Sequence, residues 1–502
     1  MMDMNLYDFL TNRVAANLHE RKQSRGMRRI CAHLTCCFLL TAATVPALAQ
    51  LDQPSRKLSR DIFQQLIEIN TTDSVGSTTV AAKAMAQRLL DAGFAREDVL
   101  VLGPNDRKGN LVARFRGTGR AKPILFIGHL DVVEALRSDW TTDPFQFVEK
   151  DGYFYGRGAQ DMKESAAILV TTFIRLKKEG YQPDRDLILA LTADEEGGKS
   201  NGVDWLLKNH RDLIEAAFVL NSDGGGVDLE HGKAITFNVQ ASEKLYGDYQ
   251  LTAVNPGGHS SLPVPDNAIY HIADSLTRLQ AYTFPFELNP VTKAYFASLS
   301  KLESGQTAAD MAAIVQEPPV TEAIGRLSLI PKYNATMRTT CVATRLSGGA
   351  ANNALPQTAQ ANVNCRILPG HSQEEIRRQL IKIFDDPKVT VRYVSNNGDA
   401  VDTGGESKGI PPTTLQPEVM QPLQTVVAQM WPGVPVIPVM ETGASDGKYT
   451  NEAGLPTYGI NGIAIDIDDV RMHGKDERVA VDSYYHGVEF YYCYVTLLSG
   501  GK

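Results

Sequence analysis

The residues best suited to chemistry in this chain are histidines and clustered carboxylates, most of which directly follow an apolar run. Carboxylates gathered at one place repel one another and stay ionised only where a cation neutralises them. The pattern therefore predicts a hydrolytic site that holds two metal ions. These residues are His129 and Asp131, then Asp161, the cluster Asp194-Glu195-Glu196, Asp223 and, near the C-terminus, His473.

Each of these groups suits a separate task. A ligating histidine needs its second ring nitrogen held, and Asp131 is placed to hold that of His129. A metal lowers the pKa of its water towards ~7, so Glu195 or Glu196 would accept a proton near neutrality while its neighbour binds metal. Taken singly, the groups have simpler explanations: a structural pair, a helix N-cap at Asp161 and a solvated acidic loop.

The elements that carry these groups alternate between apolar strands and amphipathic helices. This alternation predicts a parallel or mixed sheet covered on both faces, in which ligands bind beyond the carboxyl ends of the strands. His129, residues 194–196 and Asp223 all fall at such ends. Strands are expected over 110–116, 123–128, 187–192 and 217–220, and helices over 80–92 and 163–178.

A chain of 502 residues favours two domains, and its pattern changes near residue 244. Half-exposed strands are expected over 245–254, 340–344 and 359–368, with helices over 266–279 and 372–384 and a less regular stretch over 282–335. We therefore predict an α/β catalytic domain (50–243 and 396–502), interrupted by an inserted α+β sandwich (244–395) that serves as a lid or for dimerisation.

The first 49 residues resemble a secretory signal, with Met27 as the expected true start and cleavage after Ala49. An uncleaved N-terminal anchor is the alternative. Losing the six basic and three acidic side chains of this region takes the net charge from −8 to −11. Nothing indicates a nucleic-acid groove, and no later segment is apolar enough to span a membrane. We expect a secreted or periplasmic protein.

Three cysteines remain in the mature chain, and two of them flank a turn-rich segment. Cys341 and Cys365 would face each other across a hairpin, where an oxidising compartment permits a disulfide. Two small buried apolar side chains are the equal alternative.

Five motifs occur in order: H-x-D, G-R-G-x-x-D-x-K, D-E-E-G-G, N-x-D-G-G and H-G-x-D-E. In this order they resemble the dizinc exopeptidase and deacylase family, which includes glutamate carboxypeptidase, carboxypeptidase S, aminoacylase and acetylornithine deacetylase. The long insertion around 282–335 resembles the carboxypeptidase S branch. The resemblance implies a zinc-exopeptidase catalytic domain of the phosphorylase/hydrolase-like type.

The resemblance also implies residue roles. Asp161 would bridge two metals, His129 and Asp223 would complete one site, and Glu196 and His473 the other. Glu195 would be the general base, and Asp131 would orient His129. A cis peptide is expected after Asp161, although Met162 and Asp223 depart from the residues usual in the family. Further roles are carbonyl polarisation by His259, carboxylate binding by Arg366 and Asn353, and a pocket loop ending at Asp446.

We expect a metal-dependent exopeptidase that cleaves an amide next to a free carboxylate. Zinc suits these ligands, and Co²⁺ or Mn²⁺ are possible substitutes. The substrate would be a small peptide or, as an alternative, an N-acyl amino acid, and a homodimer would form through the inserted domain. A periplasmic solute-binding protein is the alternative from another class, because it too would have a signal peptide and two α/β domains.

Overall fold

The computed structural model describes residues 51–395 and 398–501. The predicted signal region, with Met27 and the cleavage point after Ala49, lies outside the described residues. Within the described ranges, no helix has the length and apolar character that a membrane crossing requires.

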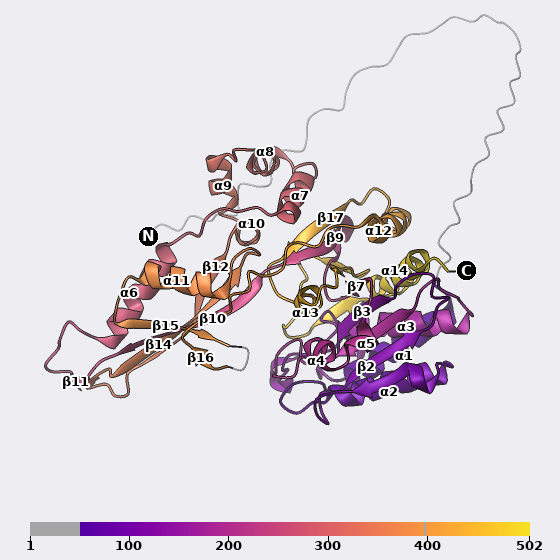
Figure 1. Cartoon of the computed structure of the whole chain (residues 1–502), viewed down its shortest axis with the longest axis horizontal. Helices are drawn as coiled ribbons and strands as arrows, with labels where there is room; N and C mark the ends of the chain where they lie inside the picture. The colour runs from indigo at the N-terminus through magenta and orange to yellow at the C-terminus, as the bar shows by residue number, and fades with distance from the viewer. Residues whose placement is uncertain (1–50, 396–397, 502) are drawn as a thin grey trace, which may run out of the picture. The chain divides into compact units, whose positions relative to one another are not determined.

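A mixed sheet of ten strands forms the larger part of the molecule (Figure 1). Its strands follow the order β1-β2-β6-β3-β7-β18-β9-β8-β19, and β17 also pairs with β9. The three neighbours β6, β3 and β7 are mutually parallel, so their carboxyl ends meet at one edge. The strands are β1 (Val99–Leu102), β2 (Asn110–Phe115), β3 (Ile124–His129), β6 (Leu187–Thr192), β7 (Phe218–Asn221), β8 (Gly226–Glu230), β9 (Lys233–Glu243), β17 (Val436–Glu441), β18 (Thr457–Gly459) and β19 (Ala464–Asp466).

Helices cover both faces of this sheet, and its central strands β3, β6 and β7 are buried at every position. In β6, Leu187, Leu189 and Leu191 belong to the cluster under one helical layer, whereas Ile188 and Ala190 belong to the cluster on the opposite face. One layer contains α1 (Gln53–Glu68), α2 (Thr78–Asp91), α3 (Lys163–Lys178), α12 (Pro417–Met430) and α14 (Val481–Ser499), and the other contains α4 (Gly202–Asn209) and α5 (Arg211–Ile214), with α13 (Gly447–Glu452) against α4.

A second sheet has the strand order β12-β14-β10-β15-β16. Alternate residues of β10, such as Tyr249 and Leu251, pack under its helices. Cys341 and Cys365 occupy paired positions on β12 and β14 and form a disulfide, the first of the two alternatives for these cysteines. The elements are β10 (Leu245–Val254), β12 (Thr340–Gly348), β14 (Thr358–Ile367), β15 (Val389–Val394), β16 (Ala400–Val401), α6 (Ala268–Ala281) and α11 (Gln373–Phe384).

The stretch that looked irregular in the sequence forms four short helices. Their apolar residues pack against Ile437 and Val439 of β17, which belongs to the large sheet. Helices of seven to ten residues show too few turns for a clear apolar period, so the sequence pattern did not reveal them. They are α7 (Pro290–Leu299), α8 (Gly305–Ile314), α9 (Thr321–Leu327) and α10 (Pro331–Met337).

Small elements complete the fold. The 3-10 turns are η1 (Arg96–Asp98) and η2 (Arg137–Asp139), and the short strands are β4 (Val148–Lys150), β5 (Tyr153–Tyr155), β20 (Arg478–Ala480), β11 (Gly258–His259) and β13 (Ala354–Leu355).

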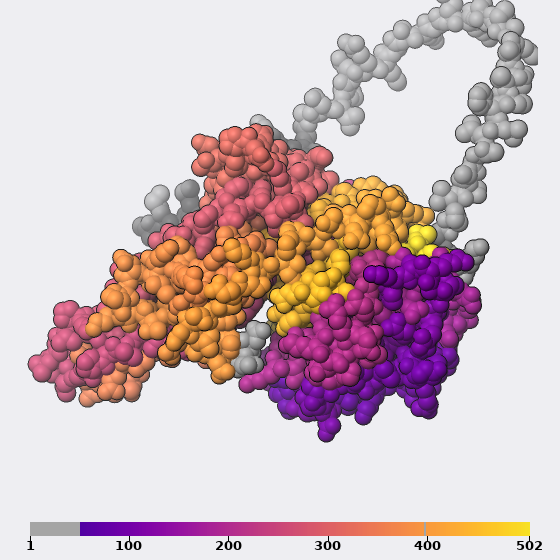
Figure 2. Space-filling model, viewed as in Figure 1, coloured from indigo at the N-terminus to yellow at the C-terminus, as the bar shows by residue number. Residues whose placement is uncertain are grey.

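The first and last thirds of the chain share the large sheet. β18, from the C-terminal part, lies between β7 and β9 of the N-terminal part, and Figure 2 shows the two parts in contact. The second sheet lies between them in sequence, and Lys244 is the single residue joining β9 to β10. The mixed α/β architecture is therefore as predicted, whereas the role of 244–395 as a lid stays a prediction.

Candidate metal centre

The carboxyl ends of β3, β6 and β7 bring the predicted histidine and carboxylates together. His129 is the last residue of β3, and its side chain is 1 % exposed. Its Nε2 lies 3.0 Å from Asp161 Oδ1 and 3.7 Å from Asp223 Oδ1. Asp223 follows β7 by two residues, and Asp161 lies two residues before α3.

His473 completes the cluster from a loop near the C-terminus. Its Nε2 lies 3.1 Å from Asp161 Oδ2 and 2.9 Å from Glu196 Oε2. The two oxygens of Asp161 thus face different histidines, His129 on one side and His473 on the other. This is the arrangement expected of a carboxylate that bridges two cations.

The donor set fits divalent metal ions. Ligand atoms of His129, Asp161 and Glu196 lie within 4.8 Å of one another, and so do those of His129, Glu195 and Asp223. Four carboxylates face only two imidazoles, which leaves a negative charge for cations to neutralise. Imidazole nitrogen and carboxylate oxygen are ligands that zinc, cobalt and manganese accept.

The electrostatics of the histidines shows how strong this negative field is. Burial opposes protonation of His129, but its hydrogen bonds to Asp161 and Asp223 outweigh burial and raise its pKa well above the usual value. Hydrogen bonds to Asp161 and Glu196 raise the pKa of His473 to about 10. Protons and metal ions would therefore compete for the same two nitrogens.

Asp131 supports the centre through both its main chain and its side chain. Its carbonyl oxygen lies 3.0 Å from His129 Nδ1, closer than its carboxylate, at 3.8 Å. The carboxylate instead accepts the backbone N–H groups of Glu195 and Glu196 at 3.2 and 3.0 Å. Asp131 thus joins the end of β3 to the loop that carries both glutamates.

Glu195 has the character of a strong proton acceptor. Burial raises the pKa of its carboxyl well above the usual value, and the charge of Asp223 adds to the effect. A carboxylate with a raised pKa beside a cation site suits general-base chemistry near neutral pH.

The loop that carries Asp161 is fixed by a buried ion pair that the sequence analysis did not single out. Glu477 Oε1 accepts the N–H groups of Gln160 at 2.7 Å and Asp161 at 3.1 Å, and Glu477 Oε2 accepts from Arg157 at 2.5 Å. The Asp161–Met162 peptide is cis, as the family resemblance implied. The sequence did hold a signal for this ion pair. Arg157 lies in the motif G-R-G-x-x-D-x-K and Glu477 in the motif H-G-x-D-E, and both motifs contain glycine.

A second supporting contact holds the glutamate loop from behind. Asp194 precedes Glu195, has φ of 56° and is 1 % exposed at its side chain. Its carboxylate pairs with Lys108 and accepts the N–H of Ser200 at 3.1 Å. Lys108 therefore supplies the charge that makes burial of Asp194 tolerable.

Asp446 lies beneath the centre with both carboxylate oxygens already engaged. Thr192 donates to Oδ2 at 3.2 Å, and Asn201 donates to Oδ1 at 2.6 Å. This geometry favours a role in which Asp446 holds the 443–446 loop in place, rather than a direct contact with the substrate.

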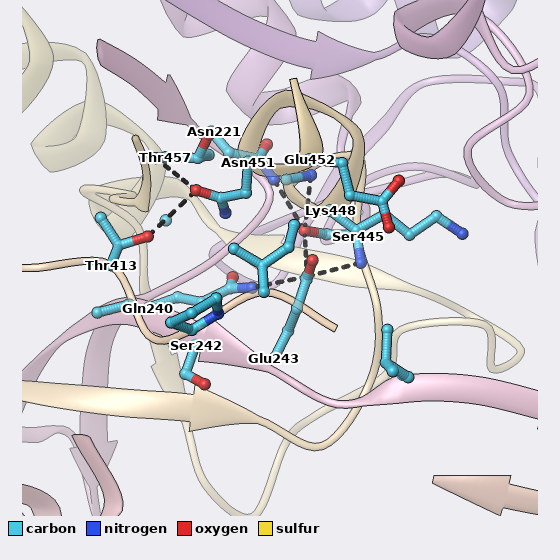
Figure 3. A pocket seen from close by; sticks show the side chains of 16 residues that line it. Asn221, Gln240, Ser242, Glu243, Thr413, Ser445, Lys448, Asn451, Glu452 and Thr457 are labelled. Atoms are coloured by element: carbon cyan, nitrogen blue, oxygen red, sulfur yellow. Dashed lines mark hydrogen bonds between the residues drawn. The ribbon is translucent and has the colours of Figure 1, made fainter. Parts of the chain in front are cut away.

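A polar cavity lies beside this loop (Figure 3). There Glu243 Oε2 accepts from the backbone and hydroxyl of Ser445 at 2.9 and 2.8 Å, and Asn221 donates to the same hydroxyl at 3.2 Å. Burial raises the pKa of Glu243 to about 7. The cavity is about 30 Å³, room for a water molecule, whereas ligand pockets are roughly 300–1,000 Å³.

The three residues expected to contact substrate from the second sheet are divided between two places. His259 on β11 lies at the far tip in Figure 1, where Asn353 O accepts the Ser260 N–H at 3.1 Å. Arg366 lies at the other end of β14, over the ring of Tyr246. Eight strand residues separate the two ends of β14, which corresponds to a distance of about 25 Å. One chain does not bring these three side chains to a common point.

Comparison with known families agrees with this centre. Residues 125–497 match the model of Peptidase family M20/M25/M40. The chain belongs to this family. It is therefore a hydrolase of the metallopeptidase and amidohydrolase type, and the solute-binding alternative is wrong.

Individual relatives support the same assignment. The chain is 28 % identical over 394 residues to probable carboxypeptidase S-like 2 of Dictyostelium discoideum, covering 76 % of this chain and 73 % of the relative. It is 28 % identical to the N-fatty-acyl-amino acid synthase/hydrolase PM20D1 of Xenopus tropicalis, over 74 % and 71 % of the two chains. The fold matches the M20 metallo-carboxypeptidase Sso-CP2 of Sulfolobus solfataricus with a TM-score of 0.66 at 15 % identity, over 89 % and 100 %.

Proposed function

We propose that this M20-family hydrolase cleaves an amide bond next to a free carboxylate, in the manner of an exopeptidase, with two metal ions held by His129, Asp161, Glu196, Asp223 and His473. The observation that carries the proposal is the placement of Asp161 between two histidines, with Glu195 beside them. The metals would be zinc, with Co²⁺ or Mn²⁺ as substitutes.

The metal ions, when bound, lower the pKa of water and polarise the scissile carbonyl. Glu195 takes the proton from the attacking water and returns it to the leaving amine. Asp131 keeps Glu195 in place through the backbone hydrogen bond described above. Arg366 binds the substrate carboxylate, a task that its two-pronged guanidinium suits.

His259 has the tautomer that carbonyl polarisation needs. The backbone N–H of Ser261 lies 3.2 Å from His259 Nδ1, so this nitrogen is an acceptor. Nε2 is therefore the ring nitrogen left to donate to an oxyanion.

Within one chain, His259 and Asn353 lie at a tip far from the metal centre. In a homodimer, a second copy of this chain would bring its own His259 and Asn353 to that centre. Large apolar side chains around that tip are exposed and suit such a contact. The exposed residues are Val254 (62 %), Leu262 (75 %), Tyr270 (59 %) and Leu346 (70 %). We propose a homodimer through 244–395, with this segment as the lid domain and 50–243 and 396–502 as the catalytic domain.

Hydrolysis of N-acyl amino acids is the second candidate, since it breaks the same bond with the same groups. The relatives named N-fatty-acyl-amino acid synthase/hydrolase favour it.

We also propose export, with residues 1–49 as the signal. Sequencing the N-terminus of the secreted protein should give Gln50, and an intact Met1 or Met27 would contradict cleavage.

The decisive experiment replaces the proposed base. Glu195→Gln should lower kcat by at least about a thousandfold while about two metal ions per chain remain bound. Glu97→Gln, an exposed glutamate of η1, is the matched control and should keep full activity. The measurement is turnover of a panel of dipeptides and N-acyl amino acids, with metal content by elemental analysis and with chelator added. Normal turnover by Glu195→Gln, or by chelator-treated protein, would refute the proposal.

A further inference from the structure

A groove lies along part of the large sheet, near the loops that carry Asp223 and His473. Its volume is about 660 Å³, within the range of about 300–1,000 Å³ typical of ligand pockets. Residues of β8, β9 and β17 line it, together with the turn that follows β19 and the helices α7 and α10.

None of the proposed metal ligands lines the groove, but residues next to them in the chain do, and the charge of Asp223 acts on Glu441, which lines it. Gly225 and Gly226, two of its lining residues, come directly after the Asp223 loop, and Met472 directly precedes His473. One end of the groove lies at Glu230, the last residue of β8. Since a strand rises about 3.3 Å per residue, the groove extends roughly 13 Å along β8 from Gly226.

Apolar side chains line both sides of this path. Ile467, Val470 and Met472 are 42 %, 56 % and 43 % exposed and lie along one wall. Leu299 and Leu302 line the opposite wall, and Leu302 is 48 % exposed. Large apolar side chains left open next to a reaction centre indicate an apolar ligand.

The charges along the groove indicate which end of the substrate enters it. Asp228, Glu230, Glu303 and Glu441 line it, against the single cation Lys332. This negative field repels the substrate carboxylate, which Arg366 is proposed to bind elsewhere. The part of the substrate in the groove is therefore the part on the acyl side of the scissile amide.

We propose that this groove binds the hydrocarbon chain of an N-acyl amino acid and selects for medium or long acyl chains. The inference rests on the proposed function and names its substrate class. The ammonium group of a dipeptide would also suit acidic surroundings. It would lie close to the reacting bond, however, and would leave the apolar part of the groove empty.

The test places a charge within the groove. Leu302→Glu and Val470→Glu alter exposed side chains, so folding should be unaffected. Leu329→Glu is the matched control, because Leu329 is 83 % exposed in the turn between α9 and α10 and does not line the groove. The ratio of kcat/KM for N-myristoyl-glycine to that for N-acetyl-glycine should fall at least about tenfold in both groove variants and stay unchanged in the control.

Binding of myristate, a product, gives a readout that does not depend on turnover. Calorimetry should show that the protein binds myristate, and that each groove variant binds it at least about fivefold more weakly. If the protein binds no myristate, or if the groove variants bind it normally, the inference is overturned. If dipeptides with a free amine are cleaved and acyl chains are not preferred, the proposed function stands and the groove assignment fails. If no amide substrate is cleaved but myristate binding follows the variants, the proposed function fails and the groove remains.

Discussion

Glu477 accepts the backbone N–H of Asp161 at 3.1 Å, although 316 residues separate the two in sequence. The same carboxylate pairs with Arg157, and Glu477 is wholly buried. The position of Asp161, the proposed bridging ligand, therefore depends on an ion pair that contacts the proposed ligands only through the main chain.

Glu477→Ala should lower the free energy of unfolding by about 3–5 kcal/mol, because it leaves Arg157 buried without a partner. Metal affinity should fall about 10–100-fold, as for other groups that orient ligands. Thermal unfolding and metal titration measure the two effects. Glu149→Gln, which removes an exposed partner of Arg60, should change stability by less than about 1 kcal/mol. Unchanged metal affinity in Glu477→Ala would contradict this role.

Lys108→Met should loosen the loop that carries the two glutamates. It removes the charge facing Asp194, and a buried carboxylate without its partner costs about 3–5 kcal/mol. We expect lower stability and a fall in kcat greater than the rise in KM, because Glu195 is displaced while the substrate contacts remain. Steady-state kinetics and chemical unfolding test this. Lys150→Met, on an exposed lysine, is the control, and equal effects of the two substitutions would show that Lys108 has no special role.

Metal binding should release protons. The raised pKa values of His129 and His473 mean that both rings hold protons at neutral pH when no cation competes. Calorimetry in buffers of different ionisation enthalpy should therefore detect about two protons released at pH 7. His473→Ala should release about one fewer. Apparent metal affinity should fall as the pH is lowered, and affinity independent of pH would contradict the assignment of both histidines as ligands.

Glu374 should make the second sheet sensitive to acid. Its hydrogen bond with Arg377 is the main cause that lowers its pKa to about 2, and its side chain is 1 % exposed. A carboxyl group whose pKa is lower in the folded state stabilises that state at pH values above its unfolded pKa, which is near 4.5. This stabilisation is lost as the pH falls towards 2. Glu374→Gln should therefore cost about 2 kcal/mol at pH 7 and much less near pH 3. A difference from wild type that stays constant with pH in denaturant unfolding would refute this.

The sequence was most informative where local pattern and environment agree. β6 and α3 match their expected ranges, because an uninterrupted apolar run predicts a buried strand and a long amphipathic run predicts a helix. The residues at the ends of β3, β6 and β7 converge as expected, since parallel strands present their carboxyl ends at one edge.

The sequence was least informative where a residue acts through a distant partner. Nothing near Lys108 or Glu477 in the chain identifies Asp194 or Arg157 as its partner. The short helices α7–α10 gave no clear period, because their apolar residues pack against β17, which lies 100 or more residues later. His259 was identified by its motif, but a motif does not report that β11 lies at the tip of another sheet.

The insertion of β18 between β7 and β9 has a consequence for synthesis of the protein. A ribosome must complete nearly the whole polypeptide before this gap can close, and His473 is made later still. A growing or truncated chain thus lacks an assembled reaction centre. With His473 as a proposed metal ligand, amide cleavage would therefore begin only after translation has passed this residue.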